Sequence, residues 1–356
     1  MRTRTYNKKN KRRGGSKKRS ASRSPDNSGT KRARKSASRS PSPQQRRFTP
    51  LSKEELKEAI DHMDETTGIH AQHGHVNTWD VSKITDMSSL FHDKRHFNQP
   101  LDKWNVSHVV NFESMFDGCF EFNQPLHDWK IKTHHNSEIS MVSMFKFNYS
   151  FNQNIESWNV SEVIDMYQMF DKCQSFNQPL NKWNVSKVKD MSLMFLNCYN
   201  FNQPLNNWNV SNVKDMQYMF CNCLVFNQNL NNWNVSSVVN MIGMFQGCTN
   251  FNQSLKWDIS DTVSTGGMFK DSKGGLGFVP DEDCENEEDP ISFEKIPKER
   301  GFRLEVELIP EDGKGRCYDA ESLLKIRNHI SPMTRKPFTK KDIRRIENYK
   351  SSKNHT

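Results

Sequence analysis

Phe201–Val225, FNQPLNNWNVSNVKDMQYMFCNCLV, decides the fold, because residues 226–250, FNQNLNNWNVSSVVNMIGMFQGCTN, repeat it almost letter for letter. Tryptophans mark the repeat along the chain: Trp79, Trp104, Trp129, Trp158, Trp183, Trp208, Trp233 and Trp257. Their spacings are 25, 25, 29, 25, 25, 25 and 24 residues, so the chain holds eight copies and one four-residue insertion. A fixed period in this range predicts a solenoid in which each copy forms one coil stacked on the next.

Within one coil, the apolar residues predict one short strand followed by a helical or 3-10 turn. Trp208–Val210 alternates between apolar and polar residues, as a strand does. Ser211 is placed to cap a turn in which Val213, Met216 and Met219 recur at three- and four-residue steps. Because stacking puts like residues on like, the core is predicted to consist of columns; its members include Trp104, Trp183, Trp208, Trp233, Phe195, Phe220 and Phe245.

A capping helix is predicted in front of the first coil. Ser52 and Glu55 form a capping box, and Leu56, Ile60 and Met63 lie on one helical face. Terminal repeats need a cover for their open apolar side. We therefore expect a capping helix and loop over residues 51–75 and the solenoid over residues 76–272.

Two groups of potential metal ligands lie in these regions. His70, His73 and His75 lack a Cys or carboxylate spaced to complete a site, so a polar loop is favoured over a metal site. Five cysteines hold one place in the coil: Cys119, Cys173, Cys198, Cys223 and Cys248. A column does not converge tetrahedrally on zinc, and small apolar fillers are favoured over disulfides. We expect no metal and no cofactor.

One row of outward positions on the predicted strand is almost constant: Asp80, Asn105, Asn159, Asn184, Asn209, Asn234 and Asp258. Repeat proteins bind partners on extended surfaces, so this row is a candidate partner-binding face. The insertion around Thr133–Asn136 is predicted to protrude from one side. For both features, an ordinary solvated surface is an equally good interpretation.

Residues 1–50 are predicted to be a disordered basic Arg/Ser-rich tail. Residues 1–47 hold 18 of the 51 Lys and Arg residues and one acidic residue, Asp26, a net charge of +17, which leaves −8 for the remainder. Two basic clusters resemble a bipartite nuclear localisation signal that pairs with an import carrier: Lys18, Arg19, Lys31, Arg32, Arg34 and Lys35. The alternatives are weak, non-specific nucleic-acid binding and an inert tail.

The cellular compartment is predicted from the absence of an apolar membrane span and of a signal peptide in the sequence. No apolar run approaches the length of a membrane span, and the charged N-terminus does not resemble a signal peptide. Eight cysteines without a secretion signal predict a reducing compartment and free thiols. We therefore expect an intracellular protein, not secreted, either nuclear or cytoplasmic.

The repeat W-N-V-S-x-V-x-x-M-x-x-M-F-x-x-C-x-x-F-N-Q resembles the BspA-like leucine-rich repeats, the mycoplasma lipoprotein-type repeat class. The resemblance covers about residues 76–271. It implies a leucine-rich-repeat-like solenoid of eight coils and a protein-binding role, and it implies no catalytic residues. Bacterial members include secreted adhesins, from which this chain departs in its N-terminus.

The repeat ends before an acidic linker, residues 273–288. Arg303–Ile309 then alternates like a strand, and helices are predicted from about Ala320 to Asn328 and at the end of the domain. Asp289–Ile291, Tyr318–Leu323 and Ser331–Phe338 resemble the U-box, a RING-like module without zinc. The resemblance implies a small α+β domain over residues 289–349, followed by a disordered tail, 350–356.

In U-boxes, an apolar residue of the first loop and a proline of the second contact the ubiquitin-conjugating enzyme. The matching residues here are Ile291 and Pro332. A degenerate U-box that serves only structure or pairing is an equal alternative, because residues 303–316 are longer and more polar than the usual strand pair.

The sequence leaves two functions open. One is a non-catalytic scaffold whose solenoid binds an unidentified partner protein. The other is an E3 ubiquitin ligase in which the solenoid selects substrate and the U-box-like domain recruits the ubiquitin-conjugating enzyme. A hydrolase or nucleotide enzyme is disfavoured, because no Gly-rich phosphate loop or Ser/His/Asp motif is present. The chain is therefore expected to lack catalytic residues of its own.

Overall fold

The computed structural model describes residues 47–131, 138–277, 282–285, 287–292, 294–304, 316–326, 328–332 and 334–353. The predicted localisation signal, the insertion around Thr133–Asn136, Met333 and most of the predicted strand Arg303–Ile309 lie outside these residues. The described chain begins earlier than the predicted tail boundary at residue 50. Phe48 stacks on the ring of His73 at 3.8 Å, and its carbonyl accepts a hydrogen bond from the Asp80 N–H.

Helix α1 (Lys53–Asp61) caps the first coil as predicted. Ser52 Oγ accepts from the Glu55 N–H at 3.2 Å, and Leu56 and Ile60 are fully buried. The helix ends at Asp61, so Met63 lies beyond it, and Gly68, with a φ of +67°, serves the turn before strand β1 (Ile69–His70). Strand β1 pairs in antiparallel fashion with β2 (Gly74–His75), and the 3-10 helix η1 (Val76–Thr78) leads into the solenoid.

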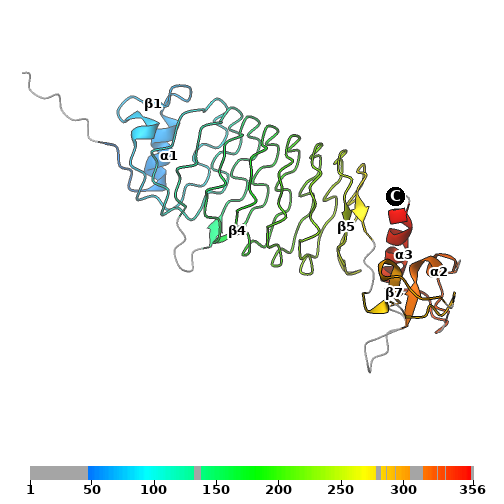
Figure 1. Cartoon of the computed structure of the whole chain (residues 1–356). Coiled ribbons are helices and arrows are strands. Elements are labelled where there is room, and N and C mark those ends of the chain that lie inside the picture. Colours follow the sequence, from blue (N-terminus) through cyan, green and yellow to red (C-terminus); the bar gives the residue numbers. More distant parts are fainter. Residues whose placement is uncertain are drawn as a thin grey trace, which may run out of the picture. The chain divides into compact units, whose positions relative to one another are not determined.

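The repeat region winds as stacked coils around one continuous core, as predicted (Figure 1). The tryptophans are all between 0% and 5% exposed. Trp208 and Trp233 stack with their ring centroids 6.3 Å apart, and the indole N–H of Trp208 donates to the Leu180 carbonyl of the preceding coil at 2.9 Å. The column thus supplies both apolar contact and a hydrogen bond at each step.

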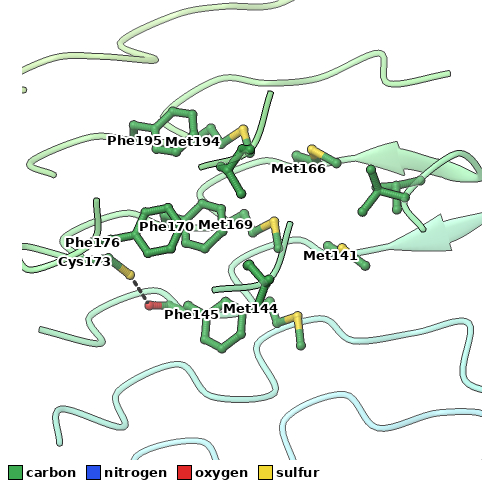
Figure 2. Packing of buried hydrophobic residues seen from close by; sticks show 14 of the residues in the cluster. Met141, Met144, Phe145, Met166, Met169, Phe170, Cys173, Phe176, Met194 and Phe195 are labelled. Carbon is green, nitrogen blue, oxygen red and sulfur yellow. Dashed lines mark hydrogen bonds between the residues drawn. The ribbon is translucent and has the colours of Figure 1, made fainter. Parts of the chain in front are cut away.

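Phenylalanines and methionines form further internal columns (Figure 2). Phe145, Phe170 and Phe195 stack in sequence, with centroids 5.8 and 5.6 Å apart. The Cys173 thiol donates to the carbonyl of Phe145 at 2.9 Å, and the other cysteines of the column do the same one coil apart. The cysteines therefore fill small spaces, as predicted, and also satisfy a buried carbonyl. Burial raises the pKa of the Cys173 thiol well above its usual value.

The predicted place of the strand within the coil is wrong. Strands β3 (Ile139–Ser140) and β4 (Val163–Asp165) pair in parallel, and isolated bridges continue this ladder at equivalent positions: Asp86, Asn111, Asp190, Asp215, Asn240 and Ser264. Trp208–Val210 is not a strand, and the described residues between 79 and 277 contain no helix where the helical or 3-10 turn was expected. A second parallel pair, β5 (Ser254–Leu255) with β6 (Gly275–Leu276), closes the last coil.

Hydrogen bonds between coils explain this difference. In coil six, the N–H groups of Met216, Tyr218, Phe220 and Asn222 donate to carbonyls of coil seven, and the same four places do so at every step from coil one to coil seven. Tyr218 and Asn222 have φ of 52° and 60°, in the left-handed region. Residues with right-handed and left-handed φ alternate here, so that every second N–H points along the stack toward the next coil. In a helix, the same N–H groups would donate to carbonyls of their own coil.

The C-terminal segment has its own small core. Strand β7 (Gly301–Arg303) pairs in antiparallel fashion with β8 (Cys317–Asp319), and helices α2 (Ala320–Leu324) and α3 (Lys340–Lys353) follow. Short 3-10 helices η2 (Glu282–Cys284) and η3 (Lys298–Arg300) precede them. The core consists of Phe302, Leu304, Tyr318, Ala320, Leu323, Phe338, Ile346 and Tyr349.

Four expectations for this segment are corrected. Residues 273–277 belong to the last coil rather than to a linker, because β6 pairs with β5. Helix α2 ends at Leu324, four residues before Asn328, and α3 extends into the predicted tail. Cys284 and Cys317 form a disulfide with their Cα atoms 5.5 Å apart, so these two thiols are not free. The six other cysteines are free and buried.

Candidate protein-binding surface

The predicted partner-binding row lies outside the core. Asn105, Asn159, Asn184, Asn209, Asn234 and Asp258 are exposed, and Asp80 is half-buried. Asn209 Oδ1 accepts from the Ser211 N–H at 3.2 Å, and the members from Asp80 to Asn234 make the same turn bond. This bond stabilises a local turn, which explains why Asn and Asp recur here without any partner. Of the row's side chains, that of Asp258 lines a hollow of about 310 Å³.

A second asparagine row joins the coils to one another. Asn202 Oδ1 accepts from the Asn227 N–H at 2.9 Å and from the Gln228 side-chain amide at 2.9 Å. The equivalent bonds run from Asn98 to the last coil, including the step across the four-residue insertion, where Asn123 Oδ1 accepts from the Asn152 N–H. These half-buried amides satisfy backbone groups between coils, which leaves them little freedom to bind a partner.

A hollow on the parallel-ladder side of the solenoid interrupts the repeated surface. It has a volume of about 710 Å³ and spans coils three to six. We call it the charged groove, and its lining residues are Glu138, Glu162, Ile164, Lys187, Lys189, Asn212 and Lys214. Ile164, Lys189 and Lys214 occupy the place before the bridge residue, where the chain alternates out of the ladder. The backbone thus spaces these side chains one coil apart.

The charges of the groove are separated along its length. The Lys187 ammonium pairs with the Glu162 carboxylate, while the exposed Lys189 and Lys214 have no ion pair among the described residues. Asp165 lies in the bridge row beside them, and burial, reinforced by the neighbouring Asp190, raises the pKa of its carboxyl despite a hydrogen bond from the Tyr167 N–H. The groove therefore offers two unpaired cations at one end and carboxylates at the other.

The charged groove is not among the sites predicted from the sequence. Lys189 and Lys214 stand at a coil position where the residue type changes from copy to copy: Thr85, Val110, Ile164, Lys189, Lys214 and Val239. That variation among otherwise similar copies is the signal that distinguishes this row from the constant asparagine row. Recognising it as one surface requires knowing that these positions lie side by side on the ladder.

The two candidate contacts for a ubiquitin-conjugating enzyme lie in hydrogen-bonded loops. Ile291 is half-buried and packs against the C-terminal core, and Pro332 is half-buried beside the fully buried Ser331. Ser331 Oγ accepts from the Thr334 N–H at 2.9 Å. Both side chains therefore keep part of their surface accessible.

Asp289, fully buried, holds the first of these loops. Its two carboxylate oxygens accept from the N–H groups of Ser292 at 2.7 Å and Asp319 at 3.0 Å. Burial acts to raise the pKa of this carboxyl, but the hydrogen bonds outweigh it and the pKa is lowered. The ionised carboxylate therefore links the loop to the start of α2.

The histidines form part of the packing of the first coil. His70 and His73 stack with centroids 4.3 Å apart, and the His73 carbonyl accepts from the Trp79 indole N–H at 3.1 Å. Burial, together with His73, lowers the pKa of His70. Within the described ranges, no group of three or more metal-ligand side chains occurs, and no helix has the length and apolarity that crossing a bilayer requires.

Three stretches of the chain match one protein-family model, described as a mycoplasma protein of unknown function, DUF285. The matched residues are 55–139, 137–223 and 181–275, which together cover the capping helix and the solenoid. No curated protein and no solved structure matches the chain.

Proposed function

This chain belongs to the DUF285 family, and we propose that it is a non-catalytic scaffold that binds a partner protein in the charged groove. The observation that supports this proposal is the groove itself, since Lys189 and Lys214 carry unpaired charge in a hollow on a surface otherwise built from repeated polar turns. The family match supports a repeat protein with an interaction role at most, and the unpaired charges of the groove support the location that we propose for that role.

The charge pattern defines the partner segment. Two ammonium groups one coil apart favour a segment with two acidic residues, while Glu138 at the other end favours a basic or donor residue. Ile164 between them provides apolar contact. Binding of this kind needs no reacting group.

Charge reversal tests the groove. Lys189→Glu with Lys214→Glu is expected to abolish capture of the partner, because both contacts become repulsive. Lys103→Glu with Lys130→Glu is the matched control, because it makes the same change in net charge at two exposed lysines outside the groove. A photo-crosslinker at position 189 identifies the partner and is expected to label it, whereas one at position 103 is not. Equal capture by the two double variants would refute the assignment.

A second candidate function, an E3 ubiquitin ligase, is favoured by one observation. Buried Asp289 and Ser331 hold the loops that carry Ile291 and Pro332, and no cluster of three or more metal-ligand side chains occurs among the described residues. Such loops suit a zinc-free module that docks a ubiquitin-conjugating enzyme. In an autoubiquitination assay, Ile291→Ala and Pro332→Ala would then each remove most activity, while Pro332's exposed loop neighbour, altered as Pro337→Ala, would retain it. Absence of activity across a panel of conjugating enzymes favours the scaffold alone.

For the tail, we propose that the basic clusters bind a nuclear import carrier. Lys18, Arg19, Lys31, Arg32, Arg34 and Lys35 provide the paired clusters that acidic carrier grooves accept. Replacing all six by Gln in a fluorescent fusion is expected to shift the protein from nucleus to cytoplasm. Retention in the nucleus would leave weak polyanion binding as the role of the tail.

A further inference from the structure

The last coil of the solenoid ends in a row of unused backbone donors. In coil seven, the N–H groups of Met241, Gly243, Phe245 and Gly247 donate to carbonyls of coil eight. The equivalent N–H groups of coil eight are those of Thr265, Gly267, Phe269 and Asp271, and none of them donates a hydrogen bond to any residue that the structure describes. We call these four N–H groups the donor edge.

The donor edge differs from the edge of an ordinary β-sheet. An ordinary edge strand presents N–H and C=O groups alternately. Here the carbonyls of Gly266, Met268 and Lys270 point back and accept from coil seven, so only N–H groups face outward. The backbone of another β-strand presents as many N–H donors as C=O acceptors. Its N–H groups would find no acceptor on this edge, so a β-strand is a poor match for it.

The peptide dipoles of the solenoid add to the attraction for anions. The four bonded N–H places repeat at all seven steps from coil one to coil eight and direct their N–H groups toward the C-terminal end of the stack. Fewer N–H groups, such as those of Lys214 and Val239, donate back to the preceding coil, so the net peptide dipole keeps this direction. Aligned peptide dipoles leave partial positive charge at the end where N–H groups are free, as at the N-terminus of a helix. At the opposite end, the Lys53 ammonium on α1 pairs with Asp86, which complements the carbonyl end.

The donor edge faces open space lined by cations. Thr265, Gly267 and Phe269 line a hollow of about 800 Å³ together with Lys270 and Lys273. Arg344 of α3 also lines it, while bonding the Ile259 carbonyl and the Asp261 carboxylate. A side chain added at Gly266 or Gly275 would meet no atom within 4 Å, so the space beside the edge is unfilled.

We propose that the donor edge binds an acidic, extended peptide segment through its side-chain carboxylates. The donors recur at every second residue of coil eight, and side chains on one face of an extended peptide also recur at every second residue, about 6.6 Å apart. Carboxylates are acceptors only, which matches a donor-only edge. Partly buried Phe269 and Leu276 provide apolar contact for the peptide stem. The site lies apart from the charged groove and does not depend on a role for the groove.

A nucleic acid is a weaker match. Affinity for a phosphate backbone depends on many Lys and Arg contacts. The hollow has three cations, one of them already paired, and the exposed Asp271 lies at the end of the edge. The few cations and the apolar lining favour a peptide.

The test uses the full chain and a fluorescein-labelled octapeptide, (Glu-Thr)4, with (Gln-Thr)4 as the uncharged control. Saturable binding of the Glu peptide alone is expected. Lys270→Gln with Lys273→Gln is expected to weaken it about tenfold, since two charge-assisted contacts are lost. Lys103→Gln with Lys130→Gln, which removes the same charge from exposed lysines elsewhere, is expected to leave it unchanged.

Hydrogen exchange locates the binding site independently of the lysines. Without peptide, the amides of Gly267, Phe269 and Asp271 are expected to exchange quickly, while those of Gly243 and Phe245 in coil seven are protected. Adding (Glu-Thr)4 is expected to protect the first group.

Three results would overturn the proposal: no binding, equal binding of the Gln peptide, or protection elsewhere only. Stronger binding of a single-stranded oligonucleotide of equal charge would reject a peptide as the occupant.

Discussion

Coil six and coil three use the same backbone with different side chains. In coil six, the Cys223 thiol donates to the Phe195 carbonyl at 3.0 Å. In coil three, Asn148 takes the place of the cysteine. Its side chain is fully buried, and neither its amide nitrogen nor its amide oxygen has a hydrogen-bond partner among the described residues. Coil three also contains the four-residue insertion and has a register shift between Ile139 and Ser140. Its backbone ladder nevertheless continues unbroken.

This comparison indicates which interactions define the architecture. Ser143, Phe145 and Phe147 still donate to carbonyls of coil four, as the equivalent residues of coil six donate to coil seven. The Trp129 and Trp158 rings still stack at 6.1 Å. The backbone ladder and the aromatic columns therefore continue through coil three. The cysteine column is interrupted there, so the architecture does not depend on a cysteine in every coil.

The largest expected effect tests whether the tryptophan column is equally strong in both coils. Trp129→Ala and Trp208→Ala each remove a buried indole and its hydrogen bond to the preceding coil, at 2.9 Å in both cases. Each is expected to lower the free energy of unfolding by about 4 kcal/mol. Urea unfolding followed by the remaining tryptophan fluorescence measures this. A much smaller loss for Trp129→Ala would mean that coil three is loosely packed.

The next effect concerns a charge beside coil three. Burial raises the pKa of Asp171 to about 6, against the opposing effect of Lys146 and Lys172. Its Oδ1 finds no hydrogen-bond partner in the part of the chain that the structure describes, and the equivalent place in coil six holds Cys221. Because the folded state holds the proton more tightly than the unfolded state, the destabilisation is fully present above pH 6 and is relieved as the pH falls from 6 toward 4.

Asp171→Asn is expected to remove this dependence. The wild-type chain should then be less stable at pH 7 than at pH 4.5 by on the order of 2 kcal/mol relative to the variant. Unfolding free energies at both pH values, measured on the two proteins, give this difference. If the unfolding free energies of the two proteins depend on pH in the same way, the Asp171 carboxyl is exposed to solvent.

Substitutions in the two asparagine rows are expected to lower the free energy of unfolding by smaller amounts, which differ between the rows. Asn123→Ala and Asn202→Ala each remove an acceptor that joins two coils, and each is expected to cost about 1.5 kcal/mol. Asn209→Ala removes only an exposed turn bond and is expected to cost about 0.5 kcal/mol. Thermal unfolding of the three variants compares them. A loss for Asn209→Ala as large as that for Asn202→Ala would contradict the division into inter-coil and local bonds.

The same distinction explains how much of the fold the sequence predicts. Identical residues at a fixed spacing can bury their apolar sides only by stacking, so the solenoid and its core, including Trp208 and Phe220, follow from the sequence. The spacing of Val213, Met216 and Met219 fits two backbones equally well: a helix, and a chain in which right-handed and left-handed residues alternate. These two backbones differ in which carbonyls accept from the N–H groups, those of the same coil or those of the next coil. The periodicity of apolar residues carries no information about hydrogen-bond partners.

The charged groove and the Cys284–Cys317 disulfide required the three-dimensional structure for a related reason. Lys189 and Lys214 become neighbours through the parallel ladder, whose position in the coil the periodicity misplaced. The two cysteines are 33 residues apart in sequence, and their approach depends on where β8 lies in the C-terminal core. Spacing alone assigns neither contact.

The smallest expected effect comes from replacing the buried Asn148 side chain of coil three. Asn148→Cys gives coil three the residue that coil six has at this place, and a thiol there can donate to the Phe116 carbonyl, as Cys173 does to that of Phe145. Removing two unsatisfied amide atoms from the core is expected to stabilise the chain by about 1 kcal/mol. Asn148→Ala, which removes the amide but supplies no donor, is the matched control. Chemical unfolding that finds either variant less stable than wild type would mean that the Asn148 amide has a hydrogen-bonding partner such as a buried water.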